Sequence, residues 1–136
     1  MNFNDFISNK LVRRAQVDIG LIKSLTQNAK QDLCFLNELK INENSARKIM
    51  TNYYEILRSV LEAISAKDGY KIYSHEAFTY FLKEKGENLF SIKFDRFRRI
   101  RNSINYYGKS ISIEETKENI QEIKNMVKKL TEKYLK

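Results

Sequence analysis

The fold class of this chain is decided by the stretch Ala46-Arg-Lys-Ile-Met-Thr-Asn-Tyr-Tyr-Glu-Ile-Leu-Arg-Ser-Val-Leu-Glu-Ala-Ile64. Apolar side chains recur along it at the three- and four-residue spacing of an α-helix. They form one broad face, which consists of Ala46, Ile49, Met50, Tyr53, Ile56, Leu57, Val60, Leu61 and Ile64. A face of this width is typical of a helix near the centre of a bundle. The pair Asp68-Gly69 then ends the helix.

A second apolar stripe precedes this helix. It indicates either one long helix or two helices that break near Gln27–Lys30, and it consists of Leu11, Ala15, Ile22, Leu25, Ala29, Leu33 and Leu36. Asp18 falls within the stripe, so we expect it to need a partner if it is buried. A turn follows around residues 40–44, where Asn42 is a candidate N-cap for the next helix.

Three further helices are expected in the second half of the chain. Glycines end the first two, and serines stand at the N-cap positions of the first and the last. The segment Ser112-Ile-Glu-Glu115 has the pattern of a capping box. The expected helices cover residues 75–85, which lie between Ser74 and Gly86; about 91–107, which precede Gly108; and the segment that begins at Ser112.

The composition agrees with a helical fold. The chain has 136 residues, no proline and only four glycines. Strand-rich domains need many tight turns, and these turns need glycine and proline. An all-β fold is therefore excluded, and a parallel α/β sheet is disfavoured. We expect an all-α fold, a four- or five-helix antiparallel up-and-down bundle, that forms one domain over residues 1–136.

The net charge and the cysteine content limit which kinds of ligand and metal site are expected. The net charge of +8 indicates an anionic partner, although the codon usage of an AT-rich genome explains the same excess. No apolar run is long enough to span a membrane, and the N-terminus has no signal-peptide pattern, so we expect a cytoplasmic protein without a membrane partner. One histidine and one cysteine exclude most zinc sites, and we expect no metal and no cofactor. Cys34 is interpreted as a small core residue.

The most informative segment for function is Lys93-Phe-Asp-Arg-Phe-Arg-Arg-Ile-Arg-Asn-Ser-Ile-Asn-Tyr-Tyr-Gly108. It holds four of the eight arginines of the chain, at positions 96, 98, 99 and 101. Because the planar guanidinium fork matches the oxygens of a phosphate, this pattern favours an RNA or nucleotide phosphate as ligand. The alternative is a basic helix face that is simply solvated.

Helical phase separates these arginines. Arg101 falls inside the apolar arc of the helix, so it must find a buried acid, a subunit interface or a ligand. A buried pair of Arg101 with Asp18 or a similar acid is the purely structural alternative. Arg96 and Arg99 lie outside the arc, and Arg98 lies at its edge.

A polar cluster is expected at the end of the same helix. Asn105 lies one turn beyond Arg101, and Asn102 and Tyr106 form an i, i+4 pair on a neighbouring face. The cluster therefore consists of Arg101, Asn102, Asn105 and Tyr106.

The run Arg101-Asn102-Ser103-Ile104-Asn105-Tyr106, together with Ser74-His75-Glu76-Ala77 before a short helix, resembles the HEPN domain family over roughly residues 45–135. This resemblance implies a helical bundle that dimerises and brings two such motifs into a shared cleft. Many members of the family are metal-independent RNases, including toxins paired with a nucleotidyltransferase antitoxin. Others are non-catalytic modules that bind RNA or nucleotides.

The match of site residues is partial. Arg101 corresponds to the family arginine and Asn102 to its polar neighbour, but Tyr106 stands where the family has histidine. Tyrosine has an ordinary pKa of about 10, so only about 0.1% is ionised at pH 7, and it makes a poor general base. Arg101 can still stabilise developing charge. His75, the only imidazole, reaches Arg101 if the start of its helix packs beside the end of the next helix, or across a dimer.

We therefore expect an RNA- or nucleotide-binding protein with weak or absent catalysis. Arg101, Asn102, Asn105 and Tyr106 would hold the ligand, and Arg96, Arg98 and Arg99 would add phosphate affinity. One alternative is a metal-independent RNase of the toxin type, paired with a nucleotidyltransferase, that uses Tyr106 or His75. The other is a non-enzymatic protein-interaction bundle. The loop tyrosines Tyr70 and Tyr73 are further candidates for stacking on a base.

Overall fold

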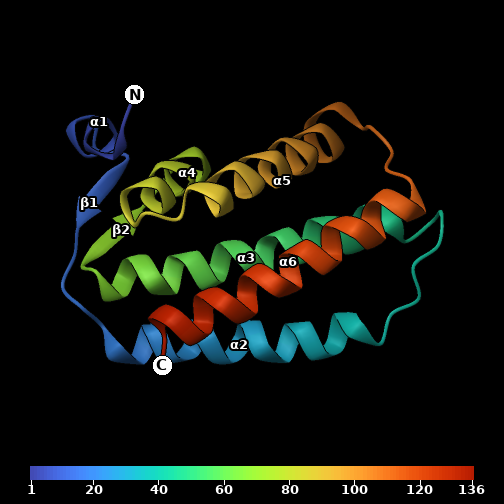
Figure 1. The fold of residues 1–136 in the computed structure, drawn as a ribbon, viewed down its shortest axis with the longest axis horizontal. Helices are drawn as coiled ribbons and strands as arrows, with labels where there is room; N and C mark the ends of the chain where they lie inside the picture. The colour runs from blue at the N-terminus through green and yellow to red at the C-terminus, as the bar shows by residue number, and fades with distance from the viewer.

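A computed structural model describes all 136 residues. The elements in chain order are α1 (Phe3–Ser8), β1 (Val12–Arg14), α2 (Ile19–Asn37), α3 (Ala46–Lys67), β2 (Tyr70–Ile72), α4 (His75–Glu84), α5 (Asn88–Tyr107) and α6 (Ile113–Tyr134). The four long helices alternate in direction, since α2 and α5 run one way and α3 and α6 run the other (Figure 1). The expected all-α antiparallel bundle is confirmed, with the short helices α1 and α4 added to it.

Helix α3 is the central element of the bundle. It packs against α2, α5 and α6, and it runs through the middle of the molecule in Figure 1. The whole apolar face that the sequence predicted for it is buried. The helix ends at Asp68, and Gly69 follows with a φ of 86°, a conformation that glycine adopts without strain. The central position inferred from the width of the apolar face is confirmed.

The prediction for the N-terminal stripe is wrong at its start. Residues 11–17 are not helical, because β1 pairs with β2 in a two-stranded antiparallel sheet. Leu11 and Ala15 have helical spacing but are exposed, whereas Val12 between them is buried against the bundle. Helix α2 is unbroken from Ile19 to Asn37, so of the two alternatives for this segment the break at residues 27–30 does not occur.

Asp18 and Cys34 both lie outside the core. Asp18 needs no buried partner, because it is the exposed N-cap of α2, and its carboxylate accepts a hydrogen bond of 3.1 Å from the backbone N–H of Leu21. Cys34 is exposed on α2 instead of packing in the core. Asn42 accepts hydrogen bonds from Asn44 and Ser45 in the turn before α3, where Ser45 holds the N-cap position.

The second half of the chain follows the predicted boundaries closely. Helix α4 starts directly after Ser74, and α5 ends at Gly108, which has the left-handed φ of 63°. A short turn reverses the chain between α4 and α5, so the two helices pack antiparallel, and Thr79 donates a hydrogen bond of 3.3 Å to Asp95. The start of α4 therefore lies beside the second half of α5. None of the helices combines the length and the apolar character that a membrane span requires.

Candidate functional site

His75, Tyr54 and Arg101 meet where the start of α4 packs against α3 and α5. The Nδ1 atom of His75 lies 3.0 Å from the hydroxyl oxygen of Tyr54, and the two rings stack with their centroids 5.9 Å apart. The guanidinium carbon of Arg101 lies 5.9 Å from the centroid of the same Tyr54 ring. Antiparallel packing of α4 and α5 thus brings the only histidine and the predicted arginine to one place within a single chain.

The guanidinium of Arg101 is largely enclosed by polar groups. Its side chain is 18% exposed, and its Nη2 lies 3.6 Å from the carboxylate of Glu55. Its Nη1 donates hydrogen bonds to the side-chain oxygen of Asn102 at 3.2 Å and to the hydroxyl of Tyr106 at 3.4 Å. Its Nε is buried without a hydrogen-bond partner. The predicted need for an acid is met, but by Glu55 and not by Asp18.

An ion-pair chain extends from Arg101 along one face of α3. Glu55 accepts a hydrogen bond of 2.9 Å from Arg58, which also donates to Glu62 at 3.0 Å. Lys71 of β2 donates to the other oxygen of Glu62 at 3.0 Å. Burial opposes ionisation of Glu62, but the hydrogen bonds from Lys71 and Arg58 outweigh it and hold the pKa of this carboxyl below its usual range.

The hydrogen bond to Tyr54 determines the tautomer and the protonation state of His75. The Tyr54 side chain is fully buried, and burial raises the pKa of its hydroxyl, so the hydroxyl stays protonated. His75 Nδ1 is the one acceptor within its reach, and this assigns the proton of the neutral imidazole to Nε2. Burial lowers the pKa of His75, and the charges of Arg58 and Arg101 lower it further against the opposing effect of Glu55. At pH 7 the ring is therefore neutral and offers an Nε2–H donor.

The remaining predicted arginines already have acidic partners. Asp95 accepts from Arg98 at 2.8 and 3.1 Å and from Arg99 at 2.9 Å, while Arg96 pairs with Glu122 of α6. Arg98 is mostly enclosed, but Arg96 and Arg99 are 50% and 75% exposed. Exposed ion pairs contribute little free energy, so a phosphate can compete for these two side chains.

The two other predicted residues lie near the open end of α5. Asn105 is exposed and forms no side-chain hydrogen bond within the chain. The ring of Tyr106 is 69% exposed, and its centroid lies 5.6 Å from the guanidinium of Arg101. Both side chains are therefore accessible to a ligand that binds at Arg101.

Sequence reasoning missed Tyr54, Glu55 and Arg58. Tyr54 is buried in the core, and its hydroxyl also holds His75. The sequence does contain a pattern that predicts this ion-pair chain: residues 55, 58 and 62 have the i, i+3, i+7 spacing of one helix face. The spacing alone could not show that α5 covers the Glu55 end of this face, which would otherwise be exposed to solvent.

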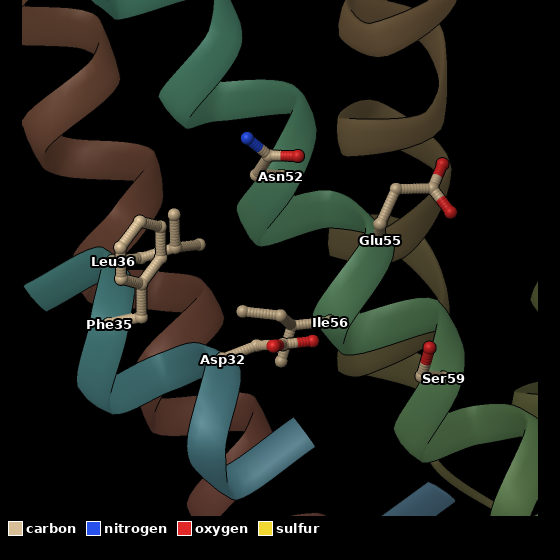
Figure 2. Close-up of a pocket in the computed structure, with 7 residues that line it drawn as sticks. All are labelled: Asp32, Phe35, Leu36, Asn52, Glu55, Ile56 and Ser59. Carbon is tan, nitrogen blue, oxygen red and sulfur yellow. The ribbon is translucent and has the colours of Figure 1, made fainter. Parts of the chain in front are cut away.

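A shallow groove lies on the other side of Glu55, between α2 and α3 (Figure 2). Its volume is about 260 Å³, and it is lined by Asp32, Phe35, Leu36, Asn52, Glu55, Ile56 and Ser59. The Glu55 carboxylate points away from α2 in this view, and Arg101 is not among the residues that line the groove. No three His, Cys, Asp or Glu side chains are grouped so that they could hold a metal ion.

Comparisons with protein-family models, with curated proteins and with solved structures find no significant match to this chain. The interpretation of the site therefore depends on its own geometry and on the resemblance of its motif.

Proposed function

We propose that this chain is a HEPN-like protein that binds RNA or a nucleotide at Arg101 and that its catalysis is weak or absent. The observation that carries the proposal is the meeting of His75 and Arg101 on the Tyr54 ring, with the Arg101 Nε buried and unpaired. A buried donor without an acceptor costs about 1–3 kcal/mol, and a phosphate oxygen would supply the missing acceptor once the Arg101 side chain moves enough to expose Nε.

The groups around Arg101 are better suited to binding an anion than to forming a buried ion pair with an acidic side chain. Asn102 and Tyr106 hold one nitrogen of the guanidinium, and Glu55 touches another only at 3.6 Å, which is long for a charge-assisted hydrogen bond. A phosphate that binds here accepts hydrogen bonds from the Arg101 guanidinium and displaces only its weak contact with Glu55. Arg96 and Arg99 lie on other faces of α5, where they pair with Glu122 and Asp95, and they would add phosphate affinity for a ligand that extends beyond Arg101.

The same geometry argues against efficient RNA cleavage. Metal-independent cleavage needs a base that takes the proton of the 2′-hydroxyl group. Tyr106 replaces the histidine of the family motif, and the lone pair of His75 is occupied by the Tyr54 hydroxyl. Neither side chain offers a free basic atom in this arrangement.

A metal-independent RNase of the toxin type, paired with a nucleotidyltransferase antitoxin, is the second candidate. It is favoured by one observation: His75 lies beside Arg101 with a lowered pKa, so the ring is neutral at pH 7. To act as a base it would have to exchange its two tautomers. The resemblance also implies a homodimer, which sedimentation equilibrium would show as twice the chain mass of 16.2 kDa.

Binding of a labelled single-stranded RNA of about 12 nucleotides, measured by fluorescence anisotropy, tests the proposal. We expect Arg101→Ala to weaken binding roughly tenfold to a hundredfold, since it removes hydrogen bonds between charged groups. The matched control is Arg47→Ala, because Arg47 is exposed at the start of α3 and forms no ion pair. Binding by the wild type should also weaken steeply between about 50 and 200 mM salt.

The same proteins incubated with an RNA pool and EDTA separate the two candidates. We expect no cleavage by the wild type above the level of Arg101→Ala. Cleavage that disappears in Arg101→Ala would establish the RNase instead. A folded wild type that binds no RNA at low salt would contradict both and leave the non-enzymatic protein-interaction bundle.

A further inference from the structure

The two-stranded sheet presents a basic and aromatic face next to the Arg101 site. We call the sheet, β1 with β2 and the adjoining Tyr73, the ribbon. Val12 and Ile72 are directly opposite each other and are buried, so the alternate residues point outward. Arg13 is paired with Lys71 on this outer face, and the backbone N–H of Tyr73 extends the pairing by donating to Leu11 at 2.8 Å.

Tyr73 is the exposed aromatic of the ribbon. Its ring is 58% exposed, and the guanidinium carbon of Arg13 lies 5.3 Å from the ring centroid. Arg13 has no acidic partner; its Nε donates only to the backbone oxygen of Lys10, at 3.4 Å. An accessible aromatic ring with an adjoining free guanidinium is the combination on which single-stranded nucleic acids stack their bases.

The ribbon is joined to the Arg101 site in two ways. Tyr73 stands two residues before His75, and Lys71 holds Glu62 at the far end of the ion-pair chain. The segment of α3 between Glu55 and Glu62 spans about 10 Å at 1.5 Å per residue, so a strand of several nucleotides is long enough to run from Arg101 along this chain to the ribbon.

We infer that the ribbon is a second contact site for single-stranded RNA, in which Tyr73 stacks on a base and Arg13 binds a neighbouring phosphate. This inference rests on the proposed function and names its ligand as a strand of several nucleotides, not a mononucleotide. The strand must be single, because the bases of a double helix are stacked on one another and are not free to lie on Tyr73.

The test compares two probes: a labelled single-stranded RNA of about 12 nucleotides and uridine 5′-monophosphate, which carries only one base and one phosphate. We expect Tyr73→Ala to weaken RNA binding about 5- to 150-fold and to leave binding of the mononucleotide unchanged. Tyr73→Phe should bind like the wild type, because it keeps the ring. Arg13→Ala should lower the salt slope of RNA binding by about 0.7.

Two further variants act as controls. Arg101→Ala should weaken the binding of both probes. Phe35→Ala should weaken neither, because Phe35 is 61% exposed but lies on α2, away from the ribbon. Since Tyr73 is an exposed side chain, its replacement should leave the thermal unfolding temperature within about a degree or two of the wild-type value.

The outcomes distinguish a failure of the ribbon site from a failure of the proposed function. If Tyr73→Ala binds the RNA as tightly as the wild type while Arg101→Ala does not, the ribbon is not an RNA contact and the proposed function stands. If Tyr73→Ala weakens both probes equally, Tyr73 belongs to the Arg101 site and the second contact is refuted. If the wild type binds neither probe, the proposed function fails and the ribbon site fails with it.

Discussion

At the scale of single residues, the Tyr54 hydroxyl and the His75 ring fix each other's protonation state. Protonation of His75 would place two N–H donors on the ring and leave the buried Tyr54 proton without an acceptor. It would also add a cation near Arg58 and Arg101. Both effects make protonation of the His75 ring less favourable, and both come from groups that α3 and α5 hold in place.

A pH dependence of stability follows from this arrangement. The pKa of His75 lies below 6.5 in the folded chain and returns to about that value on unfolding. As the pH falls through 6.5 the unfolded state therefore takes up the proton first, and folding stability is lost from there down to the folded pKa. Because the chain has one histidine, few other groups titrate between about pH 5 and 7.

Urea unfolding of the wild type and His75→Gln at pH 7.5 and 5.5 measures this effect. We expect the wild type to lose up to about 1 kcal/mol between the two conditions and His75→Gln to lose much less. An equal loss in both proteins would mean that carboxyl groups, and not His75, cause the pH dependence.

Part of the site could be predicted from residue spacing. The position of Arg101 inside an apolar arc correctly indicated partial burial, and of the three partners it left open, an acid, an interface or a ligand, the structure shows the acid Glu55 at 3.6 Å. The partner itself was not predictable, because it depends on which side chains of α3 face α5. Asp18 was a wrong choice because the segment before α2 is not helical, so this carboxylate stays exposed at a helix N-cap.

At the scale of the elements, two serine N-caps provide a matched comparison. Ser112 and Ser74 both have extended backbone angles at the start of a helix. The hydroxyl of Ser112 accepts a hydrogen bond of 3.0 Å from the backbone N–H of Glu115, but Ser74 forms no such bond. Both serines precede a helix, but Ser112 has the acidic residue of a capping box, Glu115, three residues after it, whereas Ser74 has Ala77 there.

We therefore expect Ser112→Ala to lower the free energy of unfolding by about 1 kcal/mol, since it removes a side-chain cap from α6. Ser74→Ala should change it by less than about 0.5 kcal/mol. Thermal or urea unfolding of both variants checks this. Equal losses would show that the Ser74 hydroxyl also caps α4 in solution.

The errors in element prediction lie in the N-terminal part of the chain and at β2, whose residues were expected to form a loop. Helices α3, α5 and α6 have long periodic faces, and their extents were predicted closely. A strand of three residues is too short for its alternation to be visible, and its partner β2 lies far along the sequence. Long-range pairing of this kind overrode the helical spacing of Leu11 and Ala15.

At the scale of the whole molecule, the candidate site depends on three helices. Tyr54 comes from α3, His75 from α4, and Arg101 from α5 (Figure 1). The fold class was predictable because the absence of proline and the broad face of α3 indicate a bundle. The meeting of these residues follows from the antiparallel packing of α4 on α5, and only the tertiary structure shows which side chains of α3 complete the site.

The central claim is that Arg101 and His75 form one anion-binding site, and the single histidine allows a direct measurement. The two-dimensional NMR signals of the His75 ring, followed while the single-stranded RNA is added, report on this site alone. The account predicts that the ring signals shift and that the pKa of His75 rises when the phosphate binds, and that Arg101→Ala abolishes both changes. RNA that binds without moving the His75 signals would contradict it.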